Sequence, residues 1–162
     1  MHHEKLMRSV AKRPRLVKVL KLYCHLASCV AVAAFSLLFR FYLNKSPLFA
    51  VKYLIMLGIP FVLVSLLRRY IGAPRPYEVY DFFEYRPKDS EKNSLPSRHA
   101  FSIFAIGVAT WFIYPVFGSV LLTLGLIMCV VRVALGYHFP RDVIVGALIG
   151  VISSIIGSLI LM

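Results

Sequence analysis

The longest stretch without a charged side chain extends from Ala100 to Val131 and covers 32 residues. Two more uncharged stretches, Leu22 to Phe39 and Val143 to Met162, have the same apolar character, and Ser46 to Leu67 carries a single charge at Lys52. A helix needs ~18–20 apolar residues to cross a hydrocarbon core of ~30 Å. Each stretch is therefore long enough to cross a membrane, and the longest is long enough for two short crossings.

Turn-forming residues divide the longest stretch near its middle, at Tyr114-Pro115 and at Gly118. An open sheet cannot satisfy its backbone hydrogen bonds in lipid, so the spans are expected to be helices. The sequence predicts an all-α fold, a polytopic membrane helix bundle of about five transmembrane helices, with residues 1–162 as a single integral membrane domain. The predicted spans cover roughly residues 20–43, 47–68, 97–114, 117–135 and 141–161.

The chain is strongly basic, with 19 basic and 7 acidic residues and a formal net charge of +12. Many basic residues lie within residues 1–19, a juxtamembrane segment with interleaved apolar residues that we expect to form an amphipathic helix on the membrane surface. A basic chain could bind nucleic acid. Basic residues beside apolar spans are better explained by anionic lipid headgroups, so the bilayer is the expected partner and nucleic acid is not.

A long polar stretch covers residues 69–95, and we expect it to form an ordered loop or short surface helix beside an active site. With five spans, the N-terminus, this loop and the segment from Arg132 to Asp142 lie on one membrane face. All basic residues except Arg40, Lys45 and Lys52 belong to that face. The positive-inside rule therefore predicts that it faces the cytoplasm.

Three short polar clusters lie at the ends of the predicted spans. The first runs from Arg68 to Pro76, the second from Pro96 to His99, and the third from Arg132 to Asp142. Ionisable groups next to apolar spans usually serve a function, so each cluster is a candidate functional site. Together the clusters supply arginines, a hydroxyl, two imidazoles and a carboxylate, which suffice to bind a phosphoryl group and transfer it to an imidazole without a metal.

The arginines of the first and third clusters are candidates for phosphate binding. Arg68, Arg75 and Arg132 carry fixed positive charges in a fork that matches phosphate oxygens. The alternative is an ordinary arginine at a span end that extends its charge toward water. That alternative is weakest for Arg132, because apolar residues lie on both sides of it in the sequence.

The second and third clusters hold the candidate proton-transfer groups. Ser97, Arg98 and His99 lie at the expected N-terminus of a helix, where free N–H groups and the helix dipole bind anions. His138 and Asp142 are four residues apart, so the carboxylate can fix the imidazole tautomer and leave the other nitrogen free to attack. Taken alone, each of these two groups of residues is explained equally well as the cap of a helix.

In order and spacing, the three clusters resemble the signature of the type 2 phosphatidic acid phosphatase superfamily, K-x6-R-P, P-S-G-H and S-R-x5-H-x3-D. The resemblance covers the 75 residues from Arg68 to Asp142. The matching residues are Arg68-x6-Arg75-Pro76, Pro96-Ser97-x-His99 and Arg132-x5-His138-x3-Asp142.

The resemblance implies a role for each matching residue. His138 is expected to form a phosphohistidine intermediate, His99 to protonate the leaving oxygen, and Asp142 to orient His138. Ser97 is expected to bind the phosphoryl oxygens together with the basic residues of the first and third clusters. Asp142 is the only carboxylate among the motif residues, which is too few oxygen ligands for a typical magnesium site. We therefore expect that no metal or other cofactor takes part and that vanadate inhibits the reaction.

Three positions depart from the family pattern. Arg68 replaces the usual lysine and keeps its charge. Arg98 replaces a glycine, so its backbone N–H remains and its side chain can add a phosphate contact or narrow the pocket. Val131 replaces a serine, which removes one hydroxyl. None of these changes removes a group expected to transfer a proton or attack phosphorus.

The resemblance implies that the protein is a membrane lipid phosphatase and an integral protein of a bacterial plasma membrane. The resemblance implies undecaprenyl diphosphate, phosphatidic acid or phosphatidylglycerophosphate as substrate, without choosing among them. Bacterial family members usually act on the outer face of the inner membrane, whereas the positive-inside rule predicts a cytoplasmic site for this chain. The orientation therefore stays open. The alternative function is a non-catalytic membrane protein that binds anionic lipid headgroups.

The oligomeric state is also open, since Gly146 and Gly150 fit either a dimer face or a contact inside the chain.

Overall fold

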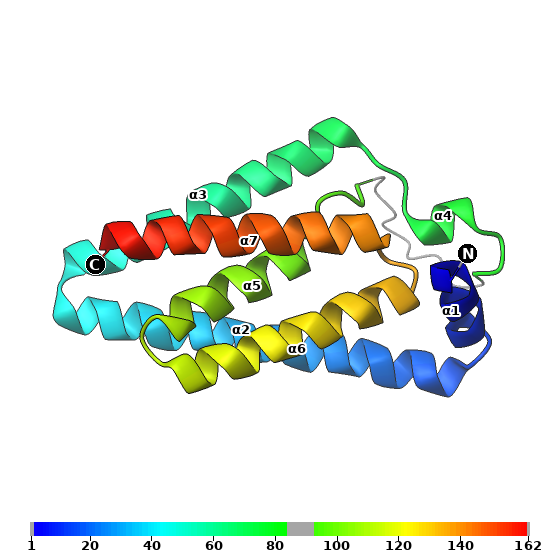
Figure 1. Cartoon of the computed structure of the whole chain (residues 1–162), viewed down its shortest axis with the longest axis horizontal. Coiled ribbons are helices and arrows are strands. Elements are labelled where there is room, and N and C mark those ends of the chain that lie inside the picture. The colour runs from blue at the N-terminus through cyan, green and yellow to red at the C-terminus, as the bar shows by residue number, and fades with distance from the viewer. Residues whose placement is uncertain (1, 84–92, 162) are drawn as a thin grey trace.

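The computed structural model describes residues 2–83 and 93–161, and within these ranges the chain is a bundle of helices (Figure 1). The described helices are α1 (His2–Ala11), α2 (Pro14–Lys45), α3 (Pro47–Ile71), α4 (Pro76–Val79), α5 (Arg98–Trp111), α6 (Pro115–Ala134) and α7 (Pro140–Leu161). The all-α membrane bundle predicted from the sequence is thereby confirmed.

Proline begins each of the long helices. Pro14, Pro47, Pro115 and Pro140 begin α2, α3, α6 and α7. A proline suits the first helical position, because the N–H that it lacks would have no partner there and its φ is already helical. At the other end of α3, Gly72 has a left-handed φ of 57° and its N–H bonds to the carbonyl of the last turn.

Four helices, α2, α3, α6 and α7, are long and apolar enough to cross a membrane. The predicted span 97–114 corresponds to α5, which has only 14 residues, ten of them buried. At about 1.5 Å per residue, α5 is ~21 Å long and shorter than a hydrocarbon core of ~30 Å. The prediction of about five spans is therefore approximate, and α5, the third of the predicted spans, is an interior helix of the bundle.

Although α5 is short, it runs along the bundle, so the turns and the polar segments lie at the two ends to which the sequence assigned them. In Figure 1, the α2–α3 turn, the α5–α6 turn and the C-terminus lie at one end, and α1 and α4 lie at the other. Because α5 begins partway along the bundle, the second polar cluster is recessed from that end. The three polar clusters still lie toward the same end, as the parity of five segments required.

The contact between α5 and α7 is made by backbone against backbone. A Cβ atom on Gly146 would lie 2.5 Å from the carbonyl oxygen of Ser97, and one on Gly150 would lie 2.5 Å from that of Phe101. No side chain larger than hydrogen fits at either position without moving α5. The two glycines are thus used for a contact inside the chain, the second of the two alternatives considered from the sequence.

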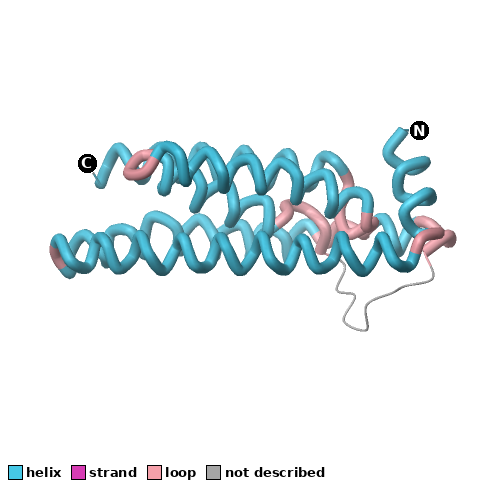
Figure 2. The backbone as a smooth tube through the Cα atoms, turned by 90° about the horizontal axis from the view of Figure 1, so that it is seen from below, coloured by secondary structure: helices cyan, strands magenta, loops and turns pink. Residues whose placement is uncertain are grey.

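The basic N-terminal segment divides into two parts. Helix α1 lies across the axis of the bundle (Figure 2), and the chain then turns at residues 12–13. Met7 of α1 is fully buried in a cluster with Ala100, Val133 and Val143, so this helix packs an apolar side chain against the bundle. The rest of the segment already belongs to α2, which begins at Pro14 and not near residue 20, because proline suits a first helical position.

Aromatic rings fill the end of the bundle opposite α1. Tyr53 stacks on Phe35 at 5.4 Å between ring centroids and lies 5.2 Å from Tyr42. Phe41 contacts Tyr42 at 5.5 Å and Tyr114 at 6.0 Å. We call these five residues the aromatic cluster. The Tyr53 side chain is fully buried, and its hydroxyl has no hydrogen-bond partner among the described residues.

Candidate active site

The three polar clusters meet at the end of the bundle that carries α1 and α4 (Figure 1). Backbone hydrogen bonds join the clusters to one another. These bonds run from the N–H of Tyr77 to the carbonyl of Gly136 (3.3 Å), from Ser94 to Ala73 (2.9 Å) and from Ser97 to Asp142 (3.0 Å). Buried backbone groups need such partners, so these bonds fix the relative positions of segments that are far apart in the sequence.

The connection between α6 and α7 positions His138 and Asp142. His138 precedes α7 and Asp142 lies in its first turn, as predicted from the sequence. The carboxylate Oδ2 of Asp142 accepts a hydrogen bond from the Phe139 N–H at 2.8 Å. Its distance to Nδ1 of His138 is 3.8 Å, which exceeds a direct hydrogen bond. Both side chains are buried, with exposed fractions of 1% and 0%.

Ser94 lies between these two groups and was not among the residues identified from the sequence. Its hydroxyl donates to Oδ2 of Asp142 at 2.5 Å and lies 3.3 Å from Nδ1 of His138. The side chain has no exposed surface. The only sequence signal for Ser94 is its place three residues before Ser97, and serine is too common in loops for that spacing to be informative.

His138 is held in its neutral form at neutral pH. Its pKa falls from 6.5 to about 4, chiefly because of burial and also because of the cations of Arg132 and Arg75, while the neighbouring carboxylate of Asp142 opposes the shift. An imidazole must be neutral to act as a nucleophile. The environment of His138 therefore suits attack on phosphorus.

The arginines of the first and third clusters bring buried positive charge to the same region. The Nε atoms of Arg75 and Arg132 are buried and have no hydrogen-bond partner among the described residues. The guanidinium of Arg75 lies 5.7 Å from the Tyr77 ring centroid, and that of Arg132 lies 5.3 Å from the Tyr137 ring. Arg68, in the last turn of α3, is also buried. A buried guanidinium group whose Nε has no hydrogen-bond partner among the described residues is costly, so the positions of Arg75 and Arg132 favour binding of an anion.

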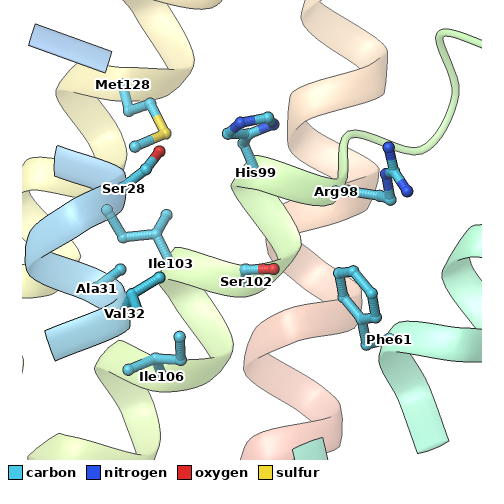
Figure 3. A pocket seen from close by; sticks show the side chains of 10 residues that line it. All are labelled: Ser28, Ala31, Val32, Phe61, Arg98, His99, Ser102, Ile103, Ile106 and Met128. Carbon is cyan, nitrogen blue, oxygen red and sulfur yellow. The ribbon is translucent and has the colours of Figure 1, made fainter. Parts of the chain in front are cut away.

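A cavity of about 370 Å³ lies beside the first turns of α5 (Figure 3). His99 lines it and is exposed to it, and both Arg132 and His138 lie within electrostatic range of His99. The remaining lining comes from α2, α3, α5 and α6 and is mostly apolar. It consists of Ser28, Ala31, Val32, Phe61, Arg98, Ser102, Ile103, Ile106 and Met128.

Ser97 and Arg98 take different positions at the start of α5. Ser97 is the N-cap, as predicted, and its fully buried hydroxyl accepts a hydrogen bond from the Ala100 N–H at 3.5 Å. Arg98 is exposed, and its side chain leaves the helix in a different direction from His99 (Figure 3). The arginine that replaces the family's glycine thus lies at the edge of the cavity.

Aromatic residues of the predicted loop 69–95 pack beside the third cluster. Phe83 lies against Gly136, whose φ of 72° is left-handed and whose missing Cβ leaves room for the ring. Phe82 stacks on Tyr80 at 5.3 Å. Of the predicted loop, residues 69–71 belong to the end of α3 and residues 76–79 form α4, whereas residues 84–92 lie outside the described residues. Within the described ranges, no three His, Cys, Asp or Glu side chains are grouped so that they could hold a metal ion.

The family model described as PAP2 superfamily matches residues 49–161, which include all three clusters. The chain belongs to the PAP2 superfamily. With four helices long enough to span a bilayer, it is an integral membrane protein, and the relatives below place it in a bacterial membrane.

Two curated relatives match over 103 residues each. The lipid A 1-phosphatase of Rhizobium johnstonii is 28% identical, with 61% of this chain and 42% of the relative covered. The bacitracin transport permease protein BcrC of Bacillus licheniformis is 30% identical, with 60% and 50% covered. The chain thus spans half or less of the length of these relatives.

Two solved structures share the fold over nearly the whole chain. LpxE of Aquifex aeolicus has a TM-score of 0.67 and 25% identity, with 94% of this chain and 92% of that chain covered. A PAP2-type phosphatidylglycerolphosphate phosphatase of Bacillus subtilis has a TM-score of 0.66 and 19% identity, with 97% and 85% covered. The bundle described above is therefore the fold of known membrane phosphatases.

Proposed function

We propose that this protein is a membrane enzyme that hydrolyses a lipid phosphate monoester or diphosphate through a phosphohistidine intermediate. The observation that carries the proposal is the position of a buried, neutral His138 near the guanidinium groups of Arg75 and Arg132, whose Nε atoms have no hydrogen-bond partner among the described residues. Membership of the PAP2 superfamily supports it.

In the first step, Nε2 of His138 attacks phosphorus, because Nδ1 faces Ser94 and Asp142. A bond forms between nitrogen and phosphorus as the bond from phosphorus to the leaving oxygen breaks. His99 gives its proton to that oxygen. Binding of a phosphate anion next to His99 favours the protonated form of the imidazole that this transfer requires.

In the second step, water attacks the phosphohistidine. His99, now neutral, takes a proton from the water, and the bond between nitrogen and phosphorus breaks. Inorganic phosphate leaves, and His138 returns to its neutral form. Both histidines are thereby restored for the next turnover.

The cations account for stabilisation of the transition state. Arg75 and Arg132 carry fixed positive charge near His138, and Arg68 carries it near His99. Charge on the equatorial phosphoryl oxygens is stabilised most by donors already held in place. The backbone N–H groups at the start of α5, after Ser97, and the Arg98 side chain add donors there. No step in this scheme requires a metal ion.

The cavity beside His99 supports a lipid substrate. Its apolar walls lie directly next to the histidine that would protonate the leaving group (Figure 3). A substrate whose leaving oxygen carries a long apolar chain could place that chain in the cavity while its phosphate contacts the arginines. We propose undecaprenyl diphosphate, phosphatidic acid, phosphatidylglycerophosphate or lipid A 1-phosphate as the substrates to test.

The test is phosphate release by the purified protein in detergent against this set of lipids, in excess EDTA, with and without vanadate. We expect turnover of at least one lipid, inhibition by vanadate, and an acid-labile phosphoenzyme that His138→Ala does not form. A protein that binds these lipids but releases no phosphate from any of them would instead be a non-catalytic binder of anionic lipids. Complete dependence on added Mg²⁺ would contradict the metal-free mechanism.

A further inference from the structure

The hydrogen bonds around Ser94 determine which nitrogen of His138 carries the proton. An ionised carboxylate only accepts hydrogen bonds, so the single hydroxyl proton of Ser94 is used in the 2.5 Å bond to Asp142. Toward Nδ1 of His138, at 3.3 Å, the same oxygen can then only accept. Nδ1 must therefore carry the imidazole proton, and Nε2 has its lone pair free.

The 3.8 Å separation between His138 and Asp142 gives Ser94 this role. A direct bond at that distance is too weak to fix the tautomer. Oδ2 of Asp142 already accepts from the Phe139 N–H at 2.8 Å and from Ser94. The hydroxyl of Ser94 is thus the group that connects the carboxylate to the imidazole.

The backbone holds Ser94 in this position. Its N–H bonds to the carbonyl of Ala73, within the first cluster, at 2.9 Å. Three residues later, the N–H of Ser97 bonds to the carbonyl of Asp142 at 3.0 Å. The serine is therefore anchored on both sides and has no exposed surface.

We propose that Ser94 is a positioning residue that transmits the orienting effect of Asp142 to His138 and holds the imidazole in the tautomer needed for phosphoryl transfer. This inference rests on the proposed function. It adds to the family signature a hydroxyl that lies outside the three motifs, and it makes Asp142 act through Ser94 and not by direct contact.

Ser94→Ala and Ser94→Cys test the proposal in the purified full-length protein. Cysteine keeps the size of the side chain but is a weak hydrogen-bonding group. We expect both variants to lower kcat by about 10- to 100-fold, the loss typical of a group that orients a reacting histidine, with little change in KM. Full kcat in Ser94→Cys would overturn the proposal even if Ser94→Ala does not fold.

Ser154→Ala is the matched control. Ser154 is also fully buried and donates one hydrogen bond, to the carbonyl of Ala105 at 2.8 Å, but it lies in the middle of α7. Loss of that hydroxyl should change thermal stability and leave kcat unchanged. An equal fall of kcat in Ser154→Ala and Ser94→Ala would show that any buried serine matters through folding alone.

A double-mutant cycle with Asp142→Asn distinguishes transmission from independent damage. If Asp142 acts through Ser94, then Ser94→Ala should cost less than about threefold once Asp142 is replaced, because residues in one hydrogen-bond network are not additive. Losses that multiply would contradict the proposed connection.

The tautomer itself can be measured without turnover, by NMR of ¹⁵N-histidine-labelled protein in detergent. The His138 signal, assigned by its absence in His138→Ala, should show a protonated Nδ1 in the wild type and in Ser154→Ala, and a mixture of tautomers in Ser94→Ala. An unchanged tautomer in Ser94→Ala would overturn the inference. Absence of phosphate release by the wild type would count against the proposed function alone.

Discussion

The two ends of the bundle are built in different ways. At the end that carries the three clusters, Ser94, His138 and Asp142 are buried polar groups whose positions are set by hydrogen bonds. At the opposite end, Tyr53 and its neighbours make ring contacts between 5.2 and 6.0 Å apart. Hydrogen bonds are directional and apolar packing is not. We therefore expect the first end to determine activity and the second to determine stability.

The largest expected effect is that of His138→Ala. Without the attacking imidazole, kcat/KM for a lipid phosphate should fall at least about 1,000-fold, as when other catalytic nucleophiles are removed. The thermal unfolding temperature in detergent should change little, because the aromatic cluster is untouched. Appreciable turnover by the folded variant would show that His138 is not the nucleophile.

The next largest effect is that of His99→Ala, and it should depend on the leaving group. A poor alkyl leaving group needs its proton, so its hydrolysis should fall by about 100-fold or more. An activated aryl phosphate needs no proton and should be hydrolysed with a much smaller loss. Equal losses for both substrates would indicate that His99 binds phosphate and does not transfer a proton.

At Tyr53, in the aromatic cluster, we expect the opposite result, with a large effect on stability and a small effect on activity. Tyr53→Ala should lower the free energy of unfolding by about 3–5 kcal/mol, as expected when a fully buried aromatic ring is removed. Below its unfolding temperature, the variant should keep kcat within about twofold, since distant sites are usually independent. Chemical denaturation and initial rates measure the two quantities. A large fall of kcat in the folded variant would show that the two ends are coupled.

Tyr53→Phe is the matched control for this variant. It keeps the ring and removes a hydroxyl that is buried without a hydrogen-bond partner among the described residues. Removing such a group should leave stability unchanged or raise it by about 1 kcal/mol. Marked destabilisation by Tyr53→Phe would mean that the hydroxyl has a partner in the membrane-inserted protein.

A further expected effect concerns the pH dependence of stability. The pKa of His138 falls from 6.5 to about 4 on folding, so below pH 6.5 the unfolded state binds more protons than the folded state. This contribution of His138 is complete above pH 6.5 and is lost as the pH falls toward 4. The unfolding temperature of the wild type should decline over this window more than that of His138→Ala. Parallel curves would show that His138 is not buried in its neutral form.

Much of the fold followed from the lengths of the uncharged stretches and from proline and glycine at their ends. The burial of α5 did not, because hydropathy is equally high for a helix that faces lipid and one that faces protein. The informative residues were the small ones, since Ala100, Ala105 and Gly107 let neighbouring helices approach α5 closely. In a membrane bundle, small residues indicate an interior position better than apolar character does.

The candidate site was predictable where its chemistry is local in the sequence. The spacing of Arg132, His138 and Asp142 identifies a cation, an imidazole and a carboxylate on one short segment. Ser94 was not predictable, because it contacts Asp142 across 48 residues and its role depends on distances that no sequence pattern encodes. The gap of 3.8 Å between imidazole and carboxylate likewise exists only in three dimensions.

The exposed residues that line the cavity beside α5 have a consequence for kinetics. Val32 and Phe61 at its edge are exposed on the sides of α2 and α3, where the bilayer surrounds the protein. For an enzyme with such an entrance, substrate arrives by diffusion in the plane of the membrane. Its rate should then follow the mole fraction of substrate among the surrounding lipids, and dilution with inert lipid should slow turnover at a constant bulk concentration.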